Sequence, residues 1–184
     1  MTEQEKGEAF CLPLSRLGRG RMREKEGKRK QFNILFLLFF LLSLTSLVYA
    51  IRIRVTGQWN EIIDVNDLAG PPGSDLIPYQ ESAPNQTLVD ITNTNRFWEV
   101  SVYKVDSLWP SAFRLYVRRT GDGKGPGNIS GGLNYLELTD REQIFFSGSR
   151  WRRSIPLQFR LEGLSVQIPP QVYTTTIIYT VTER

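Results

Sequence analysis

Apolar and polar residues alternate with a period of two in several short runs of residues 51–184. In the run Ile51–Val55 the apolar residues alternate with arginines, and in residues 98–105 Trp98, Val100 and Val102 share one face. The other runs of this kind are residues 87–92, 113–118, 135–138, 143–146, 155–162 and 173–182. No window shows the apolar stripe of an amphipathic helix. Each run therefore predicts a β-strand with one buried face.

Proline- and glycine-rich segments separate these runs, at residues 71–73, 84–85, 121–127, 131–132, 148 and 169–170. Many short strands with regular turn signals predict an all-β fold, here an antiparallel β-sandwich that is Ig-like or pilin-like. Residues 66–84 are rich in Pro, Gly and Ser and are expected to form a long surface loop. Pro156 lacks a backbone donor, which places the start of its strand at a sheet edge or a bulge.

Residues 1–50 have a different pattern from the rest of the chain. Eight Lys and Arg residues lie between Arg16 and Lys30, and an apolar run from Phe32 to Val48 follows them. A basic segment, an apolar core and small residues at a cut site predict a secretory signal peptide, cleaved after Ala50. The alternative is an uncleaved anchor helix, for which the run is slightly short. Met22 as the initiator would give a leader of ordinary length.

Both interpretations place residues 51–184 on the far side of a membrane, because the basic cluster stays cytoplasmic. The expected location is secreted, periplasmic or cell-surface, with membrane contact only through residues 32–50 if the leader remains. Residues 1–50 hold nine Lys/Arg and five Asp/Glu, whereas residues 51–184 hold fourteen of each. The net charge of +4 therefore lies in the leader, and nucleic acid is not expected as a partner.

Histidine is absent from the sequence, and Cys11 is its only cysteine. No disulfide can form within residues 51–184, and a zinc site or a Ser–His–Asp mechanism lacks its essential side chains. We expect no cofactor and no enzymatic activity. A pair of carboxylates in a cleft is the catalytic arrangement that the composition still allows.

Aromatic and basic side chains supply the candidate ligand contacts: Trp109, Tyr116, Arg150, Trp151, Arg152 and Arg153. Residues 150–153 could contact an acidic glycan, a lipid surface or a protein, or could form a solvated turn. Trp109 precedes a proline and is expected to be the most exposed tryptophan, whereas Trp98 should point into the core.

Two further segments have a chemical interpretation and a structural one. Residues 121–127 are glycine-rich, but no Gly-Lys-Ser/Thr follows, so a loop between strands is favoured over a phosphate site. Asp64, Asn66 and Asp67, or Asp122 with Asn128, offer oxygens for calcium, although the same residue types commonly stabilise turns.

The final run, Tyr173–Thr182, alternates Thr with larger side chains and follows Pro169 and Pro170. It resembles the last strand of small secreted bacterial β-sandwich proteins of the spore coat U and fimbrial-subunit type. The resemblance implies a role at the bacterial envelope or in a surface appendage. The expected function is thus a non-enzymatic structural or adhesion protein with surface protein or glycan partners, and the alternative is a carbohydrate-binding module.

Overall fold

The structure is a computed structural model that describes residues 50–184. These residues belong to one compact unit of the chain. The expected leader helix, the cut-site residues before Ala50 and the proposed start at Met22 lie outside the described residues. Within residues 50–184, no helix is long and apolar enough to cross a membrane.

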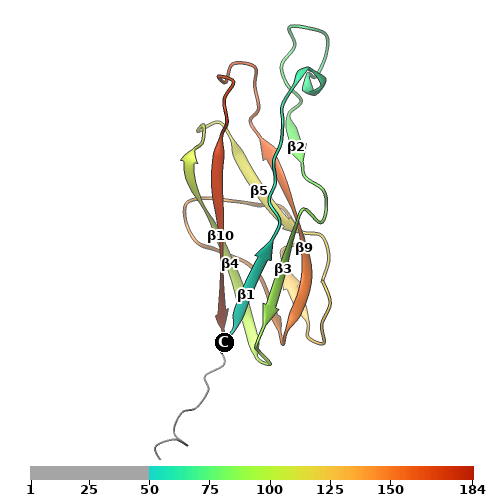
Figure 1. The fold of residues 1–184 in the computed structure, drawn as a ribbon, viewed down its shortest axis with the longest axis vertical. Helices are drawn as coiled ribbons and strands as arrows, with labels where there is room; N and C mark the ends of the chain where they lie inside the picture. The colour runs from blue at the N-terminus through green and yellow to red at the C-terminus, as the bar shows by residue number, and fades with distance from the viewer. Residues whose placement is uncertain (1–49) are drawn as a thin grey trace, which may run out of the picture. The chain divides into compact units, whose positions relative to one another are not determined.

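The described part of the chain folds into two antiparallel sheets (Figure 1). The first sheet has the order β1-β3-β9-β5-β7, and β2 also pairs with β9. Its strands are β1 (Arg52–Thr56), β2 (Tyr79–Glu81), β3 (Thr87–Thr92), β5 (Arg114–Arg119), β7 (Leu136–Glu137) and β9 (Arg152–Glu162). The second sheet has the order β10-β4-β8-β6. Its strands are β4 (Phe97–Leu108), β6 (Ile129–Gly131), β8 (Gln143–Ser149) and β10 (Thr174–Glu183).

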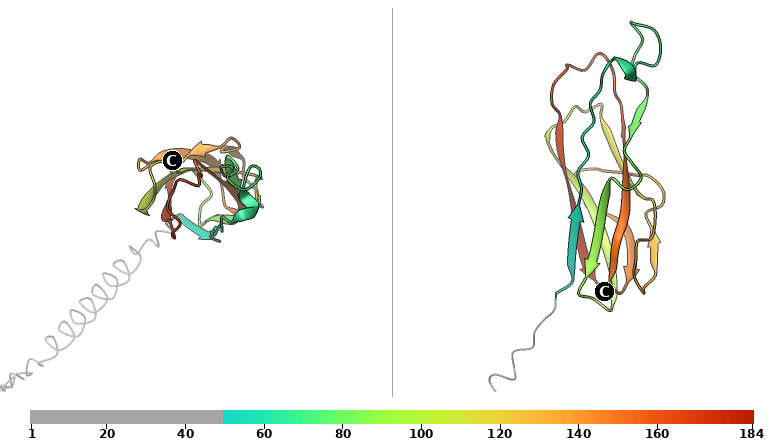
Figure 2. Two further views of the ribbon diagram at one scale, coloured as in Figure 1. Left: turned by 90° about the horizontal axis from the view of Figure 1, so that it is seen from above. Right: turned by 45° about the vertical axis from the view of Figure 1, so that its right-hand side comes forward.

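The core lies between the inner faces of these two sheets. One buried cluster contains Val89 and Leu157 from the first sheet together with Val100, Val102 and Phe146 from the second. Seen from above, the strands surround a common interior (Figure 2). Each fully buried aliphatic side chain contributes about 1.5–3 kcal/mol to folding. The predicted all-β, sandwich-like fold with antiparallel sheets is therefore confirmed.

Three strand pairings are nested around β6 in the sequence. Strand β3 pairs with β9, β4 pairs with β8, and β5 pairs with β7. From β3 to β10, each successive strand belongs to the opposite sheet. The chain thus wraps around the core as a folded-over antiparallel ribbon, and strand pairs far apart in sequence hold each sheet together.

The sandwich has two ends with different loops. The basal end comprises Ala50 before β1, the turn of residues 93–96, the loop of residues 120–128, the turn of residues 150–151 and the C-terminal residues 183–184 (Figure 1). The apical end comprises the loops of residues 57–78, 109–113 and 163–173. Strands β1 and β10 lie side by side where the two sheets meet. The point where the described chain begins is therefore at the basal end.

Two local expectations can be compared with the structure. The start of the strand containing Pro156 was expected at a sheet edge or a bulge, and the structure has the bulge: β9 is an interior strand between β3 and β5, and its register with β3 slips beside Pro156, where Ser154 adopts φ 54°. The loop expected at residues 66–84 contains a 3-10 turn, η1 (Val65–Asp67), and strand β2. It is also folded back on itself, because Leu68 and Leu76 form a β-bridge.

Candidate functional site

An open pocket of about 460 Å³ lies at the basal end of the sandwich. Its lining residues come from the β3–β4 turn and from the start of β9: Thr92, Asn93, Thr94, Asn95, Trp151 and Arg153. The structure therefore brings together two of the predicted ligand-contact residues, Trp151 and Arg153. Asn93 and Asn95 of the β3–β4 turn also line the pocket, and the alternation of apolar and polar residues did not predict this.

Local backbone geometry holds the two turns of the basal end together. Asn93 and Arg150 both adopt left-handed conformations, with φ of 60° and 58°. The backbone N–H of Arg150 donates to the carbonyl of Arg96 at 2.9 Å, and the indole N–H of buried Trp98 donates to the carbonyl of Arg150 at 2.6 Å. The buried tryptophan thus fixes the turn that presents its exposed neighbour, Trp151.

The side chains that line the pocket can make both apolar and polar contacts with a ligand. Trp151 is 40% exposed, and the guanidinium of Arg153 lies 5.7 Å from the centre of its ring. A partly exposed indole offers an apolar face, the arginine offers five hydrogen-bond donors and a charge, and asparagine amides both donate and accept. This combination suits a polar or anionic ligand with an apolar side, such as a sugar or a phospholipid headgroup.

Arg152 corrects the expectation that residues 150–153 form one exposed basic cluster. Its side chain is buried, with 8% of the residue exposed, whereas Arg150 and Arg153 are exposed. The extra residue in the bulge at Ser154 shifts the phase of β9, which turns Arg152 inward and Arg153 outward. Arg152 instead donates to the carbonyls of Asp122, at 3.0 Å, and Gly127.

A second buried arginine holds the same glycine-rich loop. Arg119 is 2% exposed and donates to the carbonyls of Gly131, at 2.9 and 3.1 Å, and Gly121, at 2.9 Å. It also pairs with the carboxylate of Asp122. The alternation of Leu115 and Val117, extended by two residues, places Arg119 on the apolar face. Its burial was not predicted from sequence, because the alternation was read only as far as Arg118 and an arginine is normally exposed.

The loop of residues 121–127 is packed closely against β9. Lys124 and Arg153 form a β-bridge, with backbone hydrogen bonds of 2.7 and 2.8 Å. A Cβ on Gly123, whose φ is 67°, would lie 2.5 Å from the carbonyl oxygen of Arg153. Glycine is required there by the close approach of two backbones, which is consistent with the expected structural role of the loop.

Trp109 is not the exposed platform that its position before Pro110 suggested. It is half-buried and packs against the core, and its indole N–H donates to the carbonyl of Phe113 at 3.2 Å. Trp98 points inward as expected, with 1% exposed. Trp59 stacks on Phe159 with ring centres 6.2 Å apart. Trp151 is therefore the tryptophan available for a ligand.

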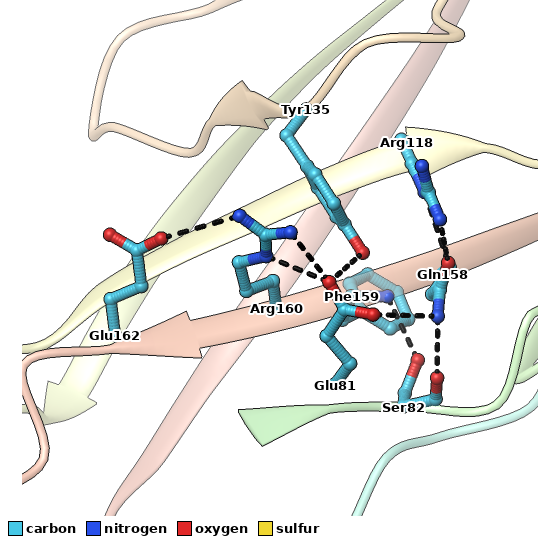
Figure 3. Close-up of polar contacts among 8 residues, drawn as sticks. All are labelled: Glu81, Ser82, Arg118, Tyr135, Gln158, Phe159, Arg160 and Glu162. Atoms are coloured by element: carbon cyan, nitrogen blue, oxygen red, sulfur yellow. Dashed lines mark hydrogen bonds and ion pairs between the residues drawn. The ribbon is translucent and has the colours of Figure 1, made fainter. Parts of the chain in front are cut away.

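Tyr116 lies away from this pocket, on the outer face of the first sheet, where it pairs with Arg160 across β5 and β9. Burial is the main cause that raises the pKa of its phenol. A neighbouring group of polar residues was not foreseen from sequence (Figure 3). Its centre is Glu81, whose carboxylate accepts from Arg160 at 2.7 and 2.8 Å and from the hydroxyl of Tyr135 at 3.0 Å.

This outer-face layer is ordered by stacking and by hydrogen bonds. The ring of Tyr135 has the guanidinium of Arg160 at 4.2 Å and that of Arg118 at 4.6 Å from its centre. Arg118 also donates to Gln158 at 2.8 and 3.0 Å. Desolvation raises the pKa of Glu81, but the hydrogen bonds from Arg160 and Tyr135 outweigh it and lower the pKa below its ordinary value. The carboxylate is thus held in its charged form as a structural partner.

The aspartates considered for calcium have structural partners. Asp64 and Asp67 form a reciprocal capping box around η1, and Asp122 pairs with Arg119. Within residues 50–184, no group of three or more His, Cys, Asp or Glu side chains is placed to hold a metal ion.

Comparison of the chain with protein-family models, curated proteins and solved structures finds no match.

Proposed function

We propose that residues 51–184 form a non-enzymatic, extracytoplasmic domain of the structural or adhesion type. The leader of residues 1–50 supports the location, and the sandwich supplies a rigid scaffold. The basal pocket supplies the contact with the partner surface. The location rests on the order of basic segment, apolar run and small residues before Ala50.

The observation that carries this proposal is the composition of the basal pocket. An exposed indole, an unpaired guanidinium and two amide-bearing turn residues line an open depression rather than an enclosed cleft. These groups bind ligands but supply no general acid or base near pH 7, because arginine does not release its proton. Contact with a surface is therefore favoured over catalysis.

A carbohydrate-binding module is the second candidate, and the exposure of Trp151 favours it. Sugars stack on exposed indole faces and bond to amides and guanidinium groups of the kind that line this pocket. Against it stands the placement of Trp59, Trp98 and Trp109, which pack against the core. A row of exposed tryptophans would have suited a long polysaccharide better than a single ring.

For the finer fold class, the nested pairings β3–β9, β4–β8 and β5–β7 support a jelly roll. An immunoglobulin-like or pilin-like domain is the alternative expected from sequence. In an immunoglobulin-like sandwich the sheets have the orders A-B-E-D and C-F-G. If the seven longest-paired strands are taken as A to G, the first sheet here reads A-B-F-D.

The test combines location with binding. We expect the protein in the envelope or medium of the producing cells, sensitive to protease added outside them. We also expect W151A/R153Q to bind isolated envelopes at least about tenfold more weakly than wild type, from the loss of one stacking contact and one charge. Arg141→Gln, an exposed change before β8, is the control. Recovery of the intact chain from cytosol would overturn the proposal, and binding to neutral polysaccharide that depends on Trp151 would favour the second candidate.

A further inference from the structure

Charge is divided between the two ends of the sandwich, although residues 51–184 have no net charge. No Lys or Arg occurs between Arg54 and Arg96, and the apical loop of residues 57–78 within this stretch holds four carboxylates. The apical loop of residues 163–173 has no charged residue. The basal end and the strand ends next to it hold four carboxylates, Asp90, Glu99, Asp122 and Glu183, and a larger number of cations: Arg52, Arg54, Arg96, Lys124, Arg150, Arg152, Arg153 and Arg184.

Three of the basal cations are available for a partner. Arg52, Arg150 and Arg153 are exposed, and no ion pair joins them to a carboxylate within residues 50–184. Arg52 lies opposite Thr92 in the β1–β3 register, so it flanks the pocket on the side away from Arg153. Exposed arginines without carboxylate partners produce a positive potential at this end.

Two exposed aromatic rings lie among these cations. Phe97 is the first residue of β4 and is 71% exposed, and Trp151 lies immediately before β9 and is 40% exposed. Their backbones are fixed, because Arg184 donates to the carbonyl of Phe97 at 2.8 Å and Arg150 donates to that of Arg96 at 2.9 Å. Aromatic rings interleaved with arginines are typical of surfaces that rest at a membrane–water interface.

The sequence before the described residues points to the same surface. The apolar run of residues 32–48 is followed, after Tyr49 and Ala50, by β1, which starts at the basal end. If this run remains in a bilayer, the first residues of β1 are within a few residues of the headgroups. An acidic apical end would meanwhile be repelled by an anionic membrane.

We propose that the basal end is a membrane-facing surface that docks on an anionic phospholipid bilayer. Arg52, Arg150 and Arg153 contact headgroup phosphates, and Phe97 and Trp151 enter the interface. This inference rests on the proposed function as a surface-contact domain and names the partner of its basal pocket. It orients the sandwich upright, with the apical loops away from the bilayer.

Vesicle binding tests the proposal. Residues 51–184 are the unit to use, because every strand pairing and both core clusters of the described chain lie within them. Circular dichroism and a cooperative thermal transition would first establish that each variant folds. We expect binding to vesicles of phosphatidylglycerol and phosphatidylcholine that weakens steeply with salt, and little binding to phosphatidylcholine alone.

The charge variants sharpen this test. Each basal arginine is expected to contribute roughly a fivefold factor to the partition coefficient, so Arg150→Gln with Arg153→Gln should lower it about 25-fold. Arg114→Gln with Arg141→Gln removes the same charge from exposed positions outside the basal end and should change it less than twofold. Equal losses in the two double variants would overturn the proposal, because they would show a dependence on net charge alone.

The indole of Trp151 gives a separate readout. On binding, we expect a blue shift of tryptophan fluorescence and quenching by brominated lipid, both of which are lost in Trp151→Phe. The full-length chain in nanodiscs of the same lipids should show the same Trp151-dependent quenching. Association with a second copy in place of vesicles would overturn the inference. Envelope binding that needs Trp151 but not anionic lipid would overturn it as well, and would leave the proposed function standing.

Discussion

Two arginine-rich regions of the sandwich use the same side chain in opposite ways. Arg119 and Arg152 are buried beneath the glycine-rich loop, and backbone carbonyls accept most of their hydrogen bonds. Arg118 and Arg160 lie half-buried on the outer face, stacked on Tyr135 and bonded to Gln158 and Glu81 (Figure 3). A buried cation cannot replace a lost partner with water, whereas an outer-face cation can. The first region should therefore matter for stability and the second mainly for surface order.

The largest expected effect comes from Arg119→Ala. The change leaves the carbonyls of Gly121 and Gly131 without their donor and opens a cavity, so we expect a loss of about 3 kcal/mol in the free energy of unfolding. Urea denaturation at pH 7 measures it. Arg118→Ala, the preceding residue on the opposite face of β5, is the matched control and should cost about 1 kcal/mol or less. Similar losses for the two variants would contradict the comparison.

The next effect concerns the loop that the buried arginines hold. Gly123→Ala puts a Cβ 2.5 Å from the carbonyl oxygen of Arg153 in a left-handed conformation, and should destabilise the fold by about 2 kcal/mol or more. Gly73 has φ 97° but no atom within 4 Å of an added Cβ. Gly73→Ala should therefore cost only about 1 kcal/mol from backbone strain. Thermal unfolding of both variants tests whether the close approach of the two backbones, rather than the positive φ angle, causes most of the loss of stability.

On the outer face, Glu81 predicts a small dependence on pH. Its folded-state pKa lies below the ordinary value of 4.5, so its stabilising contribution is present above that value and is lost as pH falls through the folded pKa. Because the pair is near the surface, we expect at most about 1 kcal/mol at pH 7. The difference in unfolding free energy between wild type and Glu81→Gln should shrink below pH 4.5. If this difference in unfolding free energy stayed constant from pH 7 to pH 3, the predicted pH dependence would be wrong.

The smallest effect is expected for Tyr135→Phe. The change removes the hydroxyl that donates to Glu81 but keeps the ring between the two guanidinium groups, so the loss should be about 0.5 kcal/mol. Tyr135→Ala removes the ring as well and should cost more. Chemical denaturation of these two variants separates the contribution of the hydrogen bond to stability from that of the stacking. A larger loss for Phe than for Ala would show that stacking does not order this face.

Alternation located the strands but not their partners. The run at residues 87–92 coincides with β3, and Val100, Val102, Leu157 and Leu161 point inward as their spacing requires. The pairing of β3 with β9 joins residues about 65 positions apart, and no local pattern encodes it. Strands β2 and β6 were missed because three residues, such as Tyr79–Glu81, are too short to show a period.

The candidate site was predictable only in part. Trp151 and Arg153 were identified from composition, because an aromatic residue in a basic cluster is visible in sequence. The burial of Arg152 depends on the bulge at Ser154, which reverses the phase of the strand. The half-burial of Trp109 depends on how the turn at Pro110 folds over Phe113. Both outcomes are decided by tertiary packing rather than by local residue pattern.

The nested strand order also constrains how the molecule is made. Strand β9 supplies the hydrogen-bonding partner of both β3 and β5, and it is made after both of them, with only β10 following it within residues 50–184. Until it emerges, both strands expose unsatisfied edges and the first sheet cannot close. Such distant pairings slow folding to milliseconds or longer. The sandwich would thus assemble only once β9 has been made, because the first sheet lacks its central strand until then.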